Sequence, residues 1–234
     1  MDRNVILQAV VGSTAYGLAT PASDQDRLGV FLAPTTDVLG LHGPSAIDQS
    51  DVRHDPDVAL HELAKFVRLA LRANPTVLEL LWATDYDVRT DTGDRLVETR
   101  DAFLSTKAVR AAYTGYAIQQ ARRLAERTAA GQEGFDSSLR SRTAKHGRHC
   151  FRLLLQGREL LTTGEMTLDV SARRDEVFAA GDLAASDPAA FAAFFERELA
   201  AFDALESVLP AAPDAERANT LVVEARLAQL ATRV

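Results

Sequence analysis

The first third of the chain carries its apolar residues in the patterns of β-strands. Asn4 to Val11 is a short run rich in apolar and β-branched residues, and Gly12-Ser13 ends it. Residues 14–23 are rich in Gly, Pro, Ser and Thr, which is typical of a loop. Asp24 to Ala33 returns to a strand pattern with a strongly apolar second half. We therefore expect two strands joined by that loop.

The following segment changes from irregular structure to helix. Pro34–Gln49 has no firm periodicity, so we expect a loop or a short hairpin, and Ser50–Val58 predicts a short strand interrupted by Pro56. After Leu60 the apolar positions take the spacing of an amphipathic helix, with a stripe of Leu63, Phe66, Val67, Ala70 and Leu71. Asn74-Pro75 is a cap followed by a first-turn proline, so a second helix is expected there with inward residues Val77, Leu78 and Leu81.

The chain beyond Trp82 reads as mainly helical. Apolar stripes predict helices through Val109, Ala112, Tyr113 and Tyr116, and through Cys150, Leu153, Leu154, Gly157 and Leu161. Asp187-Pro188 predicts a helix with Phe191, Phe195, Phe202, Leu205 and Leu209 on one side, and Pro213 begins a last helix that ends near Arg233. A charged, aperiodic stretch lies at Thr84–Thr106. We expect an α+β protein with a small mixed-sheet domain at residues 1–85 and a helical domain at 86–234.

Composition fits a soluble globular protein. Of the 234 residues, 47% are hydrophobic and 25% charged, and no apolar run approaches the ~18 residues that span a bilayer. The N-terminus has no signal-peptide pattern, and Cys150 is the single cysteine, so we expect a cytoplasmic protein without membrane partners. The net charge of -7 requires any nucleic-acid contact to use a local basic patch. The pattern specifies no oligomeric state.

Paired carboxylates are the first candidate chemistry. Asp24 and Asp26 stand at i and i+2, so on a strand they point to the same face with Cα atoms roughly 6.6 Å apart. Such a pair suits one or two Mg²⁺ ions, with Mn²⁺ as the alternative, because hard cations take carboxylate and phosphate oxygens. Asp57 is the best third carboxylate, and Asp51 and Asp55 are weaker candidates. Two aspartates alone are a weak signal, because Asp-x-Asp is frequent by chance.

Gly12-Ser13 adds a candidate phosphate turn. Glycine lets the backbone approach a ligand closely, and the serine adds a hydroxyl. The sequence GSTAYG lacks the Gly-Lys-Ser/Thr of a P-loop, and neither a Gly-x-Gly-x-x-Gly nor a Gly-x-Ser-x-Gly motif is present. The alternative is that Gly12-Ser13 merely forms a turn.

The order strand, Gly-Ser, loop and Asp-x-Asp strand resembles the polymerase-β-like nucleotidyltransferase superfamily. Its branch associated with RNA ligase and RNA repair is similar over three segments, which are GSTAYGLATPASDQDRLGVFLAP, DVALHELAKFVRLALRANPTVLELLW and KHGRHCFRLLLQGRELLTTGE. The resemblance implies that Gly12 and Ser13 hold the β- and γ-phosphates of a nucleoside triphosphate. It implies that Asp24 and Asp26 hold two Mg²⁺ ions, and that Asp57 is the third carboxylate and activates the incoming hydroxyl. The implied reaction transfers a nucleoside monophosphate to a hydroxyl and releases pyrophosphate.

Three further residues form a basic row. Lys145, His149 and Arg152 stand at i, i+4 and i+7, within about 60° on a helix. They either bind the triphosphate or an RNA backbone, or form a solvated face. In the loop before Asp24, Tyr16 either stacks on a base or packs beneath the loop, and Glu79 either pairs with a buried base or supports the site carboxylates from behind.

The acceptor defines the competing hypotheses. RNA is the first, in tRNA processing or RNA repair. A protein or a small molecule is the second. A nucleotide-binding regulatory protein without catalysis is the third, and the intact Ser13, Asp24 and Asp26 argue against it.

Overall fold

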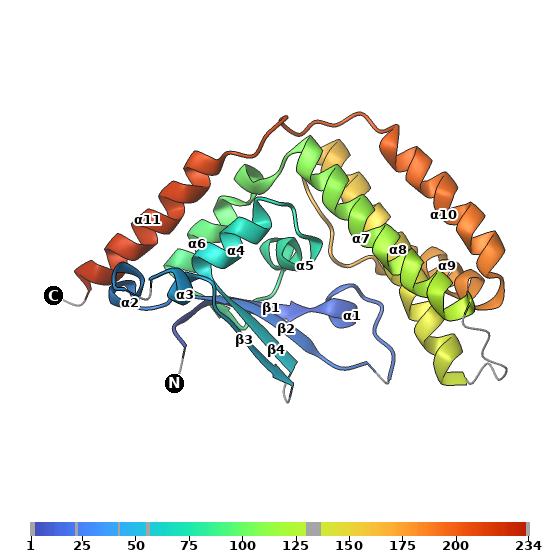
Figure 1. The fold of residues 1–234 in the computed structure, drawn as a ribbon, viewed down its shortest axis with the longest axis horizontal. Helices are drawn as coiled ribbons and strands as arrows, with labels where there is room; N and C mark the ends of the chain where they lie inside the picture. The colour runs from blue at the N-terminus through green and yellow to red at the C-terminus, as the bar shows by residue number, and fades with distance from the viewer. Residues whose placement is uncertain (1–2, 22, 42, 55–56, 130–136, 233–234) are drawn as a thin grey trace. The chain divides into compact units, whose positions relative to one another are not determined.

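A computed structural model describes residues 3–21, 23–41, 43–54, 57–129 and 137–232 (Figure 1). The chain forms two compact units. One comprises Met1–Ala108 and Pro210–Val234, and the other comprises Val109–Leu209. Across the described residues, no helix is both long enough and apolar enough to cross a membrane.

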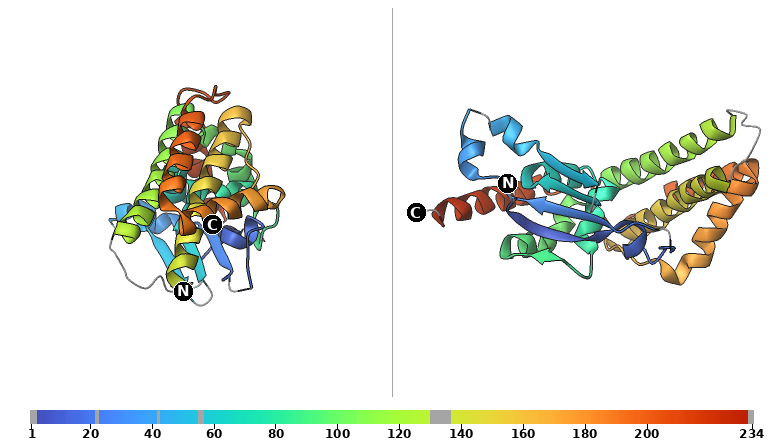
Figure 2. Two further views of the ribbon diagram at one scale, coloured as in Figure 1. Left: turned by 90° about the vertical axis from the view of Figure 1, so that its right-hand side faces the viewer. Right: turned by 90° about the horizontal axis from the view of Figure 1, so that it is seen from below.

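The first unit contains a five-stranded mixed sheet, which confirms the α+β class (Figure 2). Its strands lie in the order β3-β4-β2-β1-β5. Only β2 and β4 run parallel, and the other neighbouring pairs run antiparallel. The strands are β1 Val5–Val11, β2 Asp26–Phe31, β3 Ser50–His54, β4 Asp57–Glu62 and β5 Val88–Arg89.

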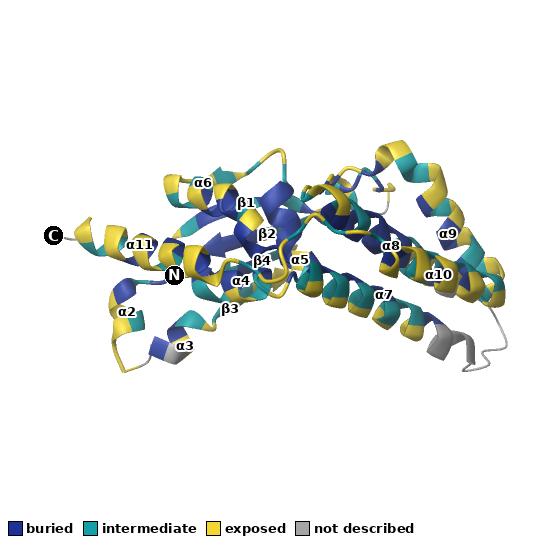
Figure 3. Ribbon diagram, turned by 90° about the horizontal axis from the view of Figure 1, so that it is seen from above, coloured by how far each residue is buried: buried dark blue, intermediate teal, exposed yellow. Residues whose placement is uncertain are grey.

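Both faces of the central strands are covered. Leu7 and Val30 are neighbours on one face and are fully buried. Figure 3 shows buried residues along β1 and β2. On the opposite face, Phe31, Ala33 and Leu60 form a small apolar cluster. Strand alternation thus produces the two-sided burial expected of a sheet with layers on both faces.

The helices described in the first unit have eight residues or fewer, apart from α11, which has 17. They are α1 Gly12–Ala15, α2 Thr35–Leu39, α3 Gly43–Ile47, α4 Leu63–Ala70, α5 Pro75–Leu78, η1 Glu79–Trp82, α6 Asp91–Glu98, η2 Arg100–Phe103 and α11 Ala215–Ala231. The predicted α4 stripe is confirmed, since Leu63, Phe66, Val67 and Ala70 are buried. The cap is confirmed too, because the Asn74 side chain accepts a hydrogen bond from the Thr76 N–H at 3.0 Å.

The prediction of a loop or hairpin at residues 34–49 was wrong, because α2 and α3 form there. The backbone N–H of Thr35 donates to the Gln229 side-chain oxygen at 2.7 Å. The Thr35 hydroxyl also donates to that oxygen at 2.7 Å and to the Arg226 carbonyl at 3.3 Å. Because these partners lie more than 190 positions away, local periodicity did not reveal the helices.

A buried ion pair attaches the last helix to the sheet. Glu62 ends β4 and is 0% exposed, and its carboxylate pairs with the Arg226 guanidinium of α11. Arg226 also donates to the Ala33 carbonyl at 2.8 Å. The same carboxylate caps α4 by accepting the Ala64 N–H at 2.7 Å. Pairing and hydrogen bonding together meet the conditions under which a buried charge is tolerated.

The second unit is a set of packed helices. Its elements are α7 Thr106–Ala129, α8 Ser137–Thr163, η3 Ser171–Arg173, α9 Arg174–Ser186 and α10 Pro188–Asp203. Asp187 caps α10 as expected, by accepting the Ala190 N–H at 2.9 Å. A Cβ at Gly157 would stand 2.9 Å from both Tyr113 and Phe202, so only glycine lets these rings pack against α8.

The two compact units divide the chain differently from the domain boundary expected at residue 85. Residues 86–108 and 210–234, which the sequence assigned to the helical domain, pack with the sheet. Helix α11, in the C-terminal segment, contacts α2, α4, α6 and η2. The second unit is therefore an insertion between two parts of the first.

Candidate functional site

Gly12 and Asp26 lie against each other at one end of the sheet. Val11, the last residue of β1, pairs with Asp26, the first residue of β2. Gly12 then leaves the strand with φ +70°, a left-handed conformation that favours glycine. A Cβ on Gly12 would overlap Asp26 Oδ2 and stand 3.2 Å from its Cγ. The carboxylate thus occupies the space that the missing side chain leaves.

Asp57 begins the neighbouring strand on the same face. The parallel register pairs Arg27 with Val58, so Asp26 and Asp57 each stand one residue before that pair. Paired positions of a sheet point to the same face. The two carboxylates therefore project side by side from one face at one end of the sheet. Asp26 is partly buried and Asp57 is exposed.

Asp24 differs from its prediction as a strand residue. It is exposed and lies two residues before β2 begins. The ladder starts at Asp26 because its partner Val11 is the last residue of β1, after which the chain turns into α1. The i, i+2 strand argument therefore does not orient the Asp24 carboxylate. Sequence adjacency still keeps it within two residues of Asp26.

Polar groups at this end of the sheet remain available. Within the described residues, neither Asp24 nor Asp57 has an ion pair, and the half-buried Ser13 hydroxyl has no protein partner. The weaker candidate Asp51 is occupied, since it pairs with Arg53 at 3.2 Å. Asp55 and Pro56 lie outside the described residues.

Tyr16 and Glu79 join the turn at Gly12-Ser13 to η1. The Tyr16 hydroxyl donates to Glu79 Oε2, and the two residues are only 9% and 4% exposed. Tyr16 also closes α1 by donating its N–H to the Gly12 carbonyl at 3.1 Å. The structure therefore agrees with the interpretation that Tyr16 packs beneath the loop. Its partner Glu79 supports the turn that carries Gly12 and Ser13.

The donor chemistry at the strand ends fits a magnesium ion that is completed by its substrate. No group of three or more His, Cys, Asp or Glu side chains forms a ready-made metal site in the part of the chain described. Mg²⁺ is, however, usually bound by one or two carboxylates together with substrate phosphates. The carboxylate of Asp26 beside Gly12, with Asp57 on the next strand, supplies such a partial set.

The basic row predicted on residues 145–152 lies in the second unit, on α8, and is split by burial. Lys145 is exposed, whereas Arg152 is 4% exposed. The Arg152 guanidinium donates to Gln156 Oε1 and lies 3.1 Å from His149 Nδ1. Burial, followed by the charge of Arg152, lowers the pKa of His149 to about 3, so its ring is neutral near pH 7. His149 thus acts as an acceptor for Arg152.

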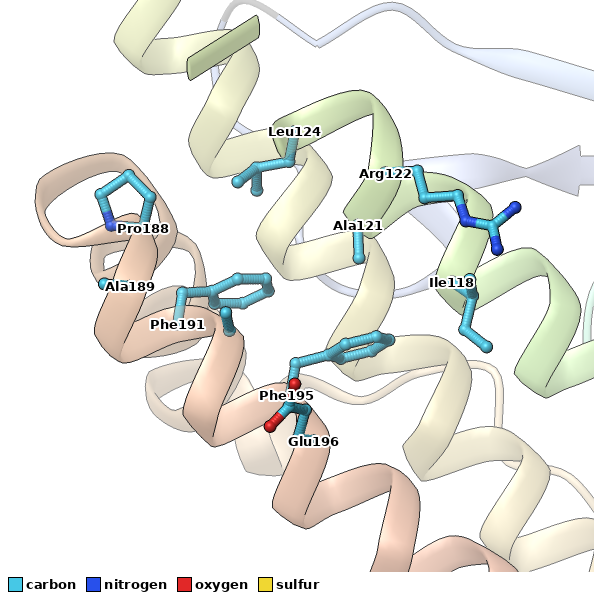
Figure 4. Close-up of a pocket in the computed structure, with 10 residues that line it drawn as sticks. Ile118, Ala121, Arg122, Leu124, Pro188, Ala189, Phe191, Phe195 and Glu196 are labelled. Carbon is cyan, nitrogen blue, oxygen red and sulfur yellow. The ribbon is translucent and has the colours of Figure 1, made fainter. Parts of the chain in front are cut away.

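A cavity in the second unit has a different character. It lies between α7 and α10 and has a volume of about 550 Å³ (Figure 4). The rings of Phe191 and Phe195 extend from α10 into it, and Arg122 and Glu196 are its charged residues. None of the predicted site residues lines this cavity, and its apolar walls do not suit a triphosphate.

A family model for the RNA repair pathway DNA polymerase beta family, RlaP, matches residues 1–224. The chain belongs to the RlaP family. This confirms the resemblance inferred from the three segments, and it extends that resemblance through most of α11. A search of curated proteins finds no match.

Two contacts of this RlaP-family chain were not predicted from the sequence. The overlap between a Gly12 Cβ and Asp26 depends on the β1–β2 register, which is set by pairing across the sheet. The Tyr16–Glu79 hydrogen bond joins residues 63 positions apart. One signal in the sequence pointed toward a buried partner. Glu79 is the single acidic residue in a mostly apolar helical stretch, and buried polar groups are usually hydrogen-bonded.

Proposed function

We propose that this RlaP-family protein transfers a nucleoside monophosphate from a nucleoside triphosphate to a hydroxyl of RNA and releases pyrophosphate. The observation that carries the proposal is the Asp26 carboxylate packed on Gly12, with Asp57 beside it on the parallel strand. This arrangement brings a glycine turn and two carboxylates to one end of the sheet. Family membership supplies the RNA context.

Gly12 and Ser13 hold the phosphates in this proposal. The left-handed Gly12 has no side chain, so a phosphate can approach its backbone, and the Ser13 hydroxyl is a donor without a protein partner among the described residues. The Tyr16–Glu79 hydrogen bond keeps the turn in place. Positioning of this kind is the main route to rate enhancement in phosphoryl transfer.

Asp24, Asp26 and Asp57 are the carboxylates proposed to hold Mg²⁺, or Mn²⁺ in its place. When bound there, the ions neutralise charge on the phosphate oxygens. Asp57 additionally accepts the proton of the attacking hydroxyl, because it is exposed and has no ion pair within the described chain. The acceptor oxygen then bonds to the α-phosphorus as the bond to the pyrophosphate oxygen breaks.

Label transfer tests this proposal. The full chain is incubated with each α-labelled nucleoside triphosphate, Mg²⁺ or Mn²⁺, and a tRNA pool. We expect label on RNA for the wild type and at least a roughly 100-fold loss for Asp24→Asn/Asp26→Asn, because a bound metal supplies several kcal/mol of charge stabilisation. Asp37→Asn/Asp203→Asn, on the exposed Asp37 and Asp203, makes the same charge change as a matched control.

The outcomes separate the remaining hypotheses. Equal transfer by the wild type and the Asp24→Asn/Asp26→Asn variant contradicts the proposed roles of these carboxylates. Label on the protein itself or on a small molecule would replace RNA as the acceptor. Nucleotide binding without transfer to any of these acceptors would support a regulatory protein instead.

A further inference from the structure

The N-terminal part of α8 concentrates positive charge in an acidic chain. Residues 137–158 contain five arginines and one lysine and no aspartate or glutamate, although the whole chain has 33 acidic and 26 basic residues. The six cations are Arg140, Arg142, Lys145, Arg148, Arg152 and Arg158. Such segregation creates the local basic patch that an acidic protein needs to meet a polyanion.

Helix stability does not account for this charge. Arg140 ends the first turn of α8, where the helix dipole favours acids and disfavours cations, and that turn has no acidic residue. Lys145 has a like-charged neighbour three residues away on each side, Arg142 and Arg148, and such pairs cost about 0.2–0.5 kcal/mol each. The clustering of cations therefore does not stabilise the helix, whereas an anionic ligand would offset the repulsion between them.

The exposed cations of this segment have no acidic partner among the described residues. Arg140, Arg142 and Lys145 are exposed, and none of them has an ion pair within the described residues. Some exposed arginines elsewhere differ, since Arg217 pairs with Asp101 at 2.7 Å and Arg68 with Asp48 at 3.1 Å. Arg140, Arg142 and Lys145 therefore remain available to an external ligand.

The geometry favours an extended ligand. At 1.5 Å per residue, Arg140 to Arg148 covers about 12 Å of the helix axis, which is too long for one compact anion. Arg148 lies over the ring of Phe178 at 4.6 Å, and Arg174 of α9 lies over the same ring at 4.4 Å. Stacking orders the guanidinium plane of Arg148 and leaves its N–H edges available for phosphates. Asp182 is the acidic side chain that acts on Arg148 from α9.

We propose that the basic segment of α8 that carries the exposed Arg140, Arg142 and Lys145 and the half-buried Arg148 binds the phosphate backbone of the RNA acceptor strand. This inference rests on the proposed function for the identity of the polyanion. The inference separates the three residues of the basic row predicted from the sequence into two groups with different roles. The exposed Lys145 binds RNA, whereas His149 and the buried Arg152 are hydrogen-bonded to each other within α8.

Salt-dependent binding tests the inference without catalysis. Fluorescence anisotropy measures binding of the full chain to a labelled 20-nucleotide single-stranded RNA, in EDTA without nucleotide, between 50 and 300 mM KCl. Each phosphate contact contributes about 0.7 to the slope of log K against log salt, so Arg142→Gln/Lys145→Gln should lower the slope by about 1.4. Affinity at 50 mM KCl should fall about tenfold.

A matched control removes two exposed arginines from other places. Arg53→Gln/Arg197→Gln makes the same change in net charge and should keep the wild-type slope. Melting temperatures measured for both double variants check that each folds. An unchanged slope for Arg142→Gln/Lys145→Gln would overturn the inference, as would competition by polyaspartate equal to that by unlabelled RNA.

Failure of the proposed function would look different. Asp24→Asn/Asp26→Asn should lose transfer and keep the wild-type RNA affinity and salt slope in EDTA. If the wild type transfers label to RNA but shows no salt-dependent RNA binding, the α8 inference fails while the proposed function stands. If RNA binding depends on Arg142 and Lys145 but no transfer occurs, the proposed function fails while the α8 surface stands.

Discussion

Two groups of cationic side chains, one in the first unit and one on α8 of the second, differ in how they are paired. In the first unit, Arg226 is buried against the Glu62 carboxylate, and the half-buried Arg27 pairs with Asp87 at 3.0 Å. On α8 of the second unit, Arg142 and Lys145 are exposed and have no acidic partner among the described residues. Paired cations serve the fold, and unpaired clustered cations are available for a ligand.

The carboxylates show the complementary division. Glu62 is buried and hydrogen-bonded to several groups, whereas Asp24 and Asp57 are exposed at the end of the sheet and unpaired in the described part of the chain. The first unit thus keeps free acids where metal and phosphate chemistry is proposed. The second keeps free bases where RNA binding is proposed. Charge pairing separates structural from functional side chains in both units.

Breaking the buried ion pair should have the largest effect on stability. Arg226→Ala leaves the Glu62 carboxylate buried without its partner, which typically costs about 3–5 kcal/mol. Arg142→Ala removes an exposed, unpaired arginine and should change the free energy of unfolding by no more than about 0.5 kcal/mol. Urea unfolding of both variants measures the difference. Similar losses for the two would remove the distinction between paired and unpaired arginines.

Filling the space beside Asp26 should affect activity more than stability. Gly12→Ala places a Cβ where Asp26 Oδ2 lies, and a displacement of about 1 Å at a reacting centre can cost about 100-fold in rate. Gly164→Ala is the matched control, because Gly164 has φ +77° and its Cβ would meet only Leu209, at 3.8 Å.

Both glycine variants should lose about 1–2 kcal/mol from left-handed strain. Only Gly12→Ala should also lose nucleotide transfer, measured as labelled monophosphate on RNA. Equal transfer by the two variants would show that the contact between Gly12 and Asp26 is not part of the site.

The neutral His149 should make the second unit sensitive to mild acid. Its folded pKa of about 3 lies below the ordinary value of 6.5, so between these values the unfolded chain binds a proton that the folded chain does not. Stability from this residue is present above pH 6.5 and is lost as pH falls. At pH 5 the loss is about 2 kcal/mol, because each pH unit corresponds to about 1.4 kcal/mol.

Urea unfolding at pH 7 and pH 5 measures that loss. His149→Gln retains an acceptor for Arg152 and cannot be protonated, so its stability should fall less than that of the wild type. His54→Gln, at an exposed histidine, should follow the wild type. If His149→Gln loses as much stability between pH 7 and pH 5 as the wild type does, another group titrates in this pH range.

Local patterns predicted the parts of the fold whose causes are local. The α4 stripe, the Asn74 cap and the Asp187 cap depend on neighbours within a few residues, and each was confirmed. Helix α2 was not predicted, because the Thr35 contacts to α11 stabilise it from far along the chain, and α3 packs against α2 and α4. Similarly, the insertion of the second unit within the first has no local signature.

The candidate site shows the same limit. The sequence placed Gly12, Ser13, Asp26 and Asp57 near one another through the order of strands, and the register agrees with that placement. It could not tell that Asp24 lies before the strand, since β2 begins only where β1 offers a partner. It also could not choose between the readings of Tyr16, because its partner Glu79 is 63 residues away.

The pairing of Glu62 with Arg226 has a consequence for folding during synthesis. The two residues are 164 positions apart, so β4 is made long before its buried carboxylate can be neutralised. At about 5–20 residues per second, the ribosome needs roughly 10–30 s to reach Arg226. The inserted helices are complete within that interval, while the sheet still lacks its last helix. We therefore expect the inserted unit to become compact first, and the sheet to close only after α11 leaves the ribosome.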